Sequence, residues 1–128
     1  MIYEALYNIL IQKMPDVFIE GETLFINQMP AEREFGGMFR DTPTGIERDG
    51  YVTSERRGTF VFALRGNDYA RLSSAIERVM EALTIHGVES GGYLIKNCYA
   101  TLEPIFYQIS LANMTETSVT FSIVYGKI

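Results

Sequence analysis

The segment from Val52 to Leu83 constrains the fold most, because its pattern predicts a strand that runs into a helix. In the strand, Phe60, Phe62 and Leu64 alternate with smaller apolar residues. Both faces of its inner half are therefore apolar, which is typical of a covered strand in the middle of a sheet.

A turn follows this strand, and Asn67 or Asp68 is expected to cap the helix after it. Apolar side chains then recur at helical spacing. We expect the helix to end at His86-Gly87, where glycine can adopt the left-handed cap and the histidine lies near the helix C-terminus. The apolar positions are Tyr69, Leu72, Ile76, Val79, Met80 and Leu83.

Further strands are predicted at Tyr93–Leu102, after the turn at Gly91-Gly92, and over the alternating segment Ser118–Tyr125. Residues 105–113 fit either another strand or an ordered loop. The strands on either side of the helix should form a right-handed parallel crossover. We predict an α+β fold for residues 1–128 as one domain: a small mixed β-sheet with an N-terminal helix and a crossover helix packed on it.

The N-terminal helix, Met1–Met14, is expected to end before Pro15. Its polar residues form one narrow stripe, whereas a surface helix needs only one apolar face of about 100°. Tyr3, Tyr7 and Ile11 belong to the additional apolar surface. We therefore expect this helix to contact a partner as well as its own sheet.

Residues 30–51, after a short strand at Thr23–Gln28, show no regular pattern and contain prolines, glycines and closely spaced charges. We predict a long loop here. A floppy hairpin tip is one reading, and a docking loop is the other, because large apolar side chains in a solvated loop need a partner. These apolar residues are Phe35, Met38, Phe39 and Ile46.

Carboxylates in this loop could serve as ligands for a hard cation such as calcium. Arginines alternate with them and nearly cancel their charge, so no metal site is predicted. Mixed charges of this kind suit the polar rim of a protein interface. The pairs are Glu32 with Glu34 and Glu47 with Asp49, and the arginines are Arg33, Arg40 and Arg48.

The chain offers little for catalysis. It has one histidine, explained by the helix end, and one cysteine, Cys98, expected to be buried in a strand. No nucleophile, phosphate-loop or dinucleotide motif is present. We predict that the protein is not an enzyme and uses no cofactor.

Charge and hydropathy bound the partners and the location. A net charge of −5 is unsuited to general nucleic-acid or anionic-membrane binding. The N-terminus lacks the basic region and cleavage site of a signal peptide, and no stretch is long enough to span a membrane. We expect a soluble protein made in a cytoplasm.

The apolar excess, with eight tyrosines and eight phenylalanines, favours a docking or self-assembling protein. Arg56-Arg57 is too short for a nucleic-acid patch and is read as a solvated strand edge. We predict a homo-oligomer formed through the first helix and a sheet edge. The candidate interface residues are Tyr3, Tyr7, Ile11, Phe35, Met38, Phe39, Arg40, Arg48, Arg56 and Arg57.

The element order resembles the small minor capsid and tail-terminator proteins of long-tailed bacteriophages. The resemblance runs through the N-terminal helix, the strand entering Ile26-Asn27-Gln28-Met29-Pro30, the long loop, the unit Thr59–Leu83 and the closing strand. It implies a ring, commonly six-fold, that caps the tail tube, stops its polymerisation and docks to the head connector.

The resemblance further implies a virion protein assembled in the host cytoplasm, whose partners are its own copies, the tail tube protein and the head–tail connector proteins. The loop at 30–51 would contact the tube or a neighbouring subunit. Two alternatives stay open: another head–tail joining or neck protein, and a small-ligand-binding regulatory module or enzyme with a pocket near the loop.

Overall fold

The computed structural model describes residues 2–30, 34–48, 55–109 and 114–128, apart from the side chains of Thr44 and Arg48. Helices and strands alternate irregularly along the chain. In order, they are α1 (Ile2–Lys13), β1 (Leu24–Ile26), β2 (Phe35–Arg48), β3 (Glu55–Gly66), α2 (Tyr69–Ala82), β4 (Ile85–Ser90), β5 (Tyr93–Ala100), β6 (Ile105–Gln108) and β7 (Thr115–Lys127).

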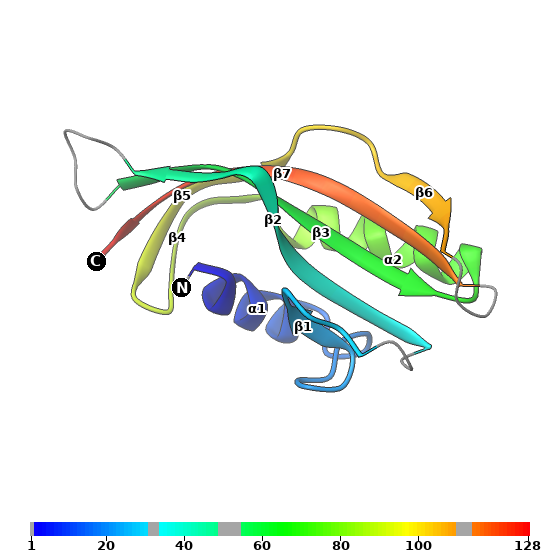
Figure 1. The fold of residues 1–128 in the computed structure, drawn as a ribbon. Coiled ribbons are helices and arrows are strands. Elements are labelled where there is room, and N and C mark those ends of the chain that lie inside the picture. The colour runs from blue at the N-terminus through cyan, green and yellow to red at the C-terminus, as the bar shows by residue number, and fades with distance from the viewer. Residues whose placement is uncertain (1, 31–33, 49–54, 110–113) are drawn as a thin grey trace.

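The strands form one seven-stranded mixed sheet in the order β1-β2-β3-β7-β5-β4, with β6 beside the first part of β7. Only β1 pairs in parallel, with β2, and the other pairs are antiparallel. The sheet curls over α1, and α2 lies behind β3 and β7 (Figure 1). The predicted α+β class, with both helices packed on a mixed sheet, is confirmed.

The core lies between the sheet and the helices and is rich in aromatic rings. The register places Phe60 of β3 opposite Phe121 of β7, and their rings stack with centroids 5.1 Å apart. Phe62 meets the edge of Phe39 from β2, also at 5.1 Å. Such contacts add about 0.5–1.5 kcal/mol per pair beyond the burial of area.

Helix α1, which is apolar on most sides, packs against several elements of its own chain. Its neighbours include β1, β4 and α2, and the Lys13 ammonium donates to the carbonyl of Ala82 at 2.8 Å. Tyr3 is 1% exposed and donates its hydroxyl to Asp41. Much of the apolar surface that suggested an external partner is therefore buried inside the chain, while Tyr7 and Ile11 are half-buried.

The prediction of a long loop at 30–51 is wrong for its central part, since residues 35–48 form strand β2. The glycines and proline that suggested a loop each have a place in this strand. The bare backbone of Gly37 lets the Phe62 ring approach, and Pro43 and Gly45 lie at the register shift between Asp41 and Ile46. Proline in a strand is tolerated at such irregularities.

Helix α2 begins as predicted, because the Asp68 carboxylate accepts from the amide of Ala70 at 3.0 Å. It ends earlier than predicted, at Ala82, and His86 lies exposed on β4. Strand β4 forms a hairpin with β5 around Gly91-Gly92, both with positive φ, as tight hairpin turns require.

The expected parallel crossover pair does not form. Strands β3 and β5 run in the same direction, but β7 lies between them and pairs antiparallel with both. The last strand of the chain, β7, therefore occupies the position next to β3 where the crossover prediction placed β5.

We predict that Gly37→Ala destabilises the protein far more than Gly36→Ala. A Cβ at Gly37 would lie 2.5 Å from a Phe62 ring atom and 3.0 Å from Phe18, an overpacking expected to lower the free energy of unfolding by about 1–3 kcal/mol. At Gly36 the one contact under 3.0 Å would be with the Met29 sulfur, at 2.7 Å, and this flexible side chain can move. Denaturant unfolding of both variants tests this, and equal losses would contradict it.

Candidate assembly surface

The face of the sheet turned away from the core, here called the outer face, is the candidate site. Phe60, Phe62 and Leu64 point inward, so the alternate residues of β3 point outward. Their neighbours on β7 include Ser118 and Thr120. Neither helix of the described chain packs on this face, which leaves it accessible to another molecule.

Three side chains line up across the outer face to form the centre of a charged cluster. Arg65 of β3 lies opposite Glu116 of β7, which lies opposite Tyr107 of β6. The Arg65 guanidinium is 3.6 Å from the Glu116 carboxylate, which also accepts a hydrogen bond from the Tyr107 hydroxyl. Glu116 is 5% exposed, and burial of a carboxylate at this depth requires such partners.

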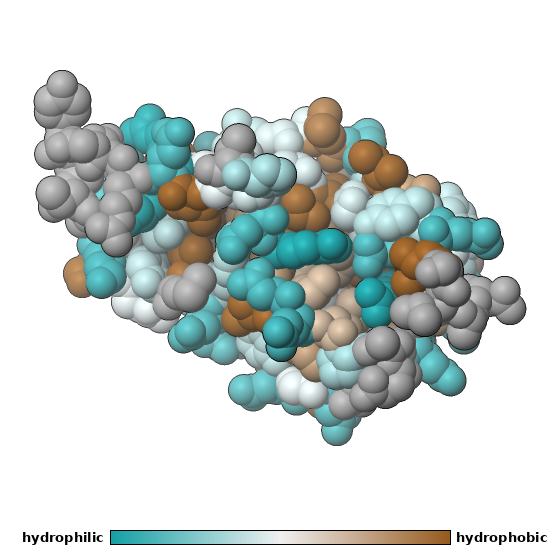
Figure 2. Space-filling view, viewed as in Figure 1, coloured by the Kyte–Doolittle hydropathy of each residue, from teal (hydrophilic) through white to brown (hydrophobic). Residues whose placement is uncertain are grey.

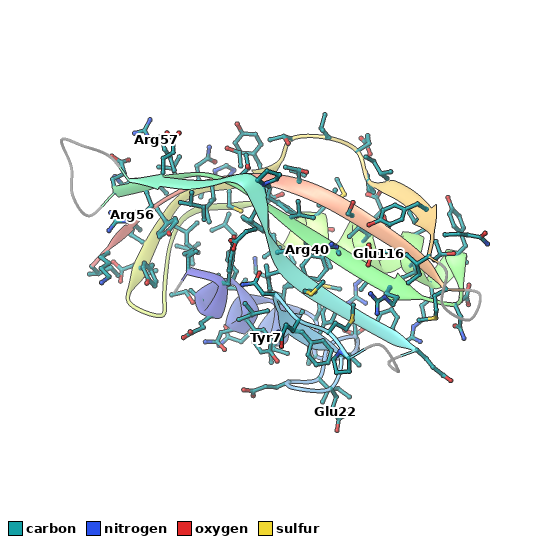
Figure 3. All side chains as sticks on the ribbon, viewed as in Figure 1. Tyr7, Glu22, Arg40, Arg56, Arg57 and Glu116 are labelled. Carbon is teal, nitrogen blue, oxygen red and sulfur yellow. The ribbon has the colours of Figure 1, made fainter. Side chains whose placement is uncertain are left out.

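Arg40 of β2 completes this charged cluster of Arg40, Arg65, Tyr107 and Glu116. Its backbone pairs with Val61, four residues along β3 from Arg65, yet its guanidinium lies 3.5 Å from the Glu116 carboxylate. Figure 3 shows Arg40 and Glu116 approaching one another across the sheet. The small intervening residues of the outer face leave room for the long side chain.

The charged cluster carries an excess of positive charge. Two guanidiniums share one carboxylate. The pKa of Tyr107 is raised, first by burial and second by its hydrogen bond to Glu116, so its hydroxyl stays neutral. The buried Nε atoms of Arg40 and Arg65 have no hydrogen-bond partner among the residues that the structure describes. An incoming carboxylate would therefore be attracted to the Arg40 side chain, which remains 40% exposed.

Exposed apolar side chains gather beside this cluster. Ile105 and Tyr107 on β6 are 60% and 40% exposed, Tyr99 on β5 is 43% exposed, and Leu102 in the connection between them is 64% exposed. Figure 2 shows hydrophobic residues along the upper edge of the molecule, over this connection and β6. An apolar area around a charged centre is typical of protein interfaces.

Four of the predicted interface residues are buried within the chain instead. Tyr3, Phe35, Met38 and Phe39 are between 0% and 8% exposed. Phe35 and Phe39 point into the core because that segment is a strand paired with β3 instead of a loop in solvent. Met38 lies opposite Ala63 and is therefore on the outer face, where it is 7% exposed. As side chains buried within one chain, they are not accessible to a partner.

Tyr7 and Ile11, also predicted at an interface, are half-buried against the core. The Tyr7 hydroxyl donates to the carbonyl of Leu24 at 2.9 Å and accepts from the amide of Gly21 at 2.9 Å. These two hydrogen bonds connect helix α1 to the turn at residues 19–23 and hold the turn against it.

The predicted arginines lie in two separate places. Only Arg40 belongs to the charged cluster. Arg57 is exposed on the far part of β3 and lies 3.6 Å from the Glu55 carboxylate. Arg56 is half-buried and lines a groove of about 540 Å³ with Tyr93 and others, whereas the side chain of Arg48 lies outside the described part of the structure.

The cysteine and the histidine lie on the paired strands β5 and β4 but point to opposite faces of the sheet. Cys98 is buried in β5, and burial raises the pKa of its thiol to about 12. His86 lies on β4 opposite Asn97, the residue next to Cys98, so its side chain is on the other face of the sheet from the thiol. Among the described residues, no group of three or more potential ligands gathers to hold a metal ion. Likewise, no helix of the described chain is long and apolar enough to cross a membrane.

Sequence reasoning missed Glu116, Tyr107 and Ile105, which are central to the candidate surface. Glu116 lies two residues before the predicted closing strand, where a single charged residue is as expected in a turn as at a binding surface. The apolar run at residues 105–107 is the available signal in the sequence, and it fits a strand and a loop equally well. Its pairing with β7 joins it to the arginines.

Comparison with known proteins gives a likeness of fold. No family model matches the chain, and no curated protein matches its sequence. A solved structure, a chain from the virion of a native gene transfer agent particle, matches with a TM-score of 0.71 at 15% sequence identity. The match covers 96% of this chain and 92% of that one, so the two share their fold over nearly their whole length.

We predict that Cys98 does not react with a thiol reagent at pH 8 while the protein is folded. Its raised pKa, about 12, leaves almost no thiolate, which is the reactive form. The reaction should become rapid in denaturant. Fast labelling of the native protein would contradict the assigned burial.

We predict that Glu116→Ala strongly destabilises the protein, because two partly buried guanidiniums would lose their shared partner. Breaking a buried ion pair costs about 3–5 kcal/mol, and the 40% exposure of Arg40 places the expected loss at or below the lower end. Denaturant unfolding measures it. Glu103→Ala, at an exposed position near this face, is the control and should change stability little.

Proposed function

We propose that this protein is a structural component of a phage-like virion, specifically a tail terminator that forms a ring on the end of the tail tube. The observation that carries the proposal is the shared fold, over 96% of the chain, with a chain of a gene transfer agent virion. The element order that resembles tail terminators supports the same assignment independently of that match.

The candidate surface supports a binding role. Its exposed apolar residues and central arginine suit contact with another protein surface. In a ring, every copy would also present the same surface to the end of the tube, and several weak contacts there would add to a stable attachment. Such a ring would end tube polymerisation by covering the surface on which the next ring of tube protein would be added.

The head connector would bind the other side of this ring. The chain would therefore act as a junction, with its own copies, the tail tube protein and the connector as partners. Its work would consist of binding, with localisation in the virion after assembly in the host cytoplasm.

We predict that the purified protein forms rings visible by negative-stain electron microscopy and co-sediments with tail tubes. Portal-bearing heads without tails provide the comparison. Binding to heads in preference to tubes would identify a neck protein instead, and binding to neither would contradict the virion role.

A further inference from the structure

We propose that the outer face receives the acidic turn at residues 19–22 of a second copy of this chain, so that the copies join head to tail. This inference deepens the proposed function, on which it rests, by naming the two surfaces of the contact between subunits. The receiving surface consists of Arg40, Ile105 and Tyr107, and the inserting one of Ile19, Glu20 and Glu22.

The receiving surface combines an apolar rim with unbalanced positive charge. Ile105 and Tyr107 are exposed, and Arg40 presents a guanidinium that shares Glu116 with Arg65. Within the charged cluster the guanidiniums outnumber the carboxylates. A partner segment with an apolar side chain beside carboxylates would match both features.

The turn at residues 19–22 is such a segment. Ile19 is 54% exposed, and Glu20 and Glu22 are exposed on either side of Gly21. It thus offers an apolar side chain and two carboxylates within four residues, which complements the receiving surface in kind.

The turn is also held rigidly, so that little entropy would be lost on docking. The amide of Ile19 donates to the Thr23 hydroxyl at 2.8 Å, and the amide of Glu22 donates to the carbonyl of Ile19 at 3.0 Å. The Tyr7 hydroxyl accepts from the Gly21 amide at 2.9 Å. Docking would not require the turn to become ordered.

The two surfaces lie on different parts of one molecule. Figure 3 shows Glu22 projecting from the lower edge, below α1, while Arg40 and Glu116 lie on the sheet. A contact between two different surfaces is heterologous, and it builds a ring when the rotation between neighbouring copies closes. Because the acidic turn of one copy complements the arginine-rich outer face of another, a second copy is the occupant that these charges favour.

Two variants separate the surfaces in the full chain. Ile105→Asp places a negative charge on the receiving surface, and the double variant Glu20→Arg with Glu22→Arg reverses the charge of the turn. Each should weaken self-association at least about tenfold, as expected for central interface positions. Sedimentation velocity across micromolar concentrations measures this.

Mixing the two variants is the decisive experiment. The first keeps an intact turn and the second an intact outer face, so an equimolar mixture should form one-to-one dimers and stop there. A mixture that stays monomeric would overturn the head-to-tail contact.

Matched controls use the same substitutions elsewhere. Ile128→Asp changes an isoleucine that is 72% exposed at the other end of the molecule, and Glu89→Arg reverses an exposed charge on β4. Both should assemble like the wild type. Circular dichroism melting of every variant reports whether it is folded.

The outcomes distinguish this inference from the proposed function. Rings that persist in both variants, or a wild-type chain that stays monomeric, would overturn the inference. Failure of the wild type to co-sediment with tail tubes would overturn the proposed function, whichever surfaces join its copies.

Discussion

The register between β3 and β7 is the constraint on which the rest of the structure depends. It pairs these strands over their length, from Glu55 opposite Gly126 to Gly66 opposite Thr115. Because successive side chains alternate between faces, a slip of one residue would exchange the two faces of the strand. Phe60 and Phe62 would then point to solvent, and Arg65 would enter the core. The burial of the aromatic side chains therefore also determines where the charged cluster lies.

The same register explains why the charged cluster is partly desolvated and how it orients its arginines at the surface. Buried ions are weak contributors to net stability, because the desolvation of each charge offsets the attraction between them. Here Glu116 is almost fully buried, while Arg40 remains partly exposed. The carboxylate orients both guanidiniums at the surface, and Tyr107 fastens the short edge strand β6 to the same point. The result is a rigid, positively charged area beside exposed apolar residues.

The sequence predicts the type of candidate site, a surface for contact with protein, but not most of the residues that form it. An apolar excess and a near-balance of charges favour contact with another protein as the hypothesis, and of the residues predicted from them only Arg40 lies in the charged cluster. Its other members could not be found, because Tyr107 and Glu116 meet Arg40 only through strands distant in the sequence. Conversely, Tyr3 and Phe39 were expected at an interface since their burial partners, α1 and β2, were not known to pack together.

By itself, the sequence determined the parts whose signal is local: the apolar faces of both helices, the Asp68 cap, the alternation in β3 and β7, and hence the α+β class. These depend on periodicity and on contacts within a few residues. Only the tertiary structure decided that residues 35–48 are a strand, that β7 lies between β3 and β5, and that the apolar excess of α1 is buried. Strand pairing joins distant segments, so a segment rich in glycine and proline becomes a strand only where a neighbouring strand supplies its hydrogen bonds.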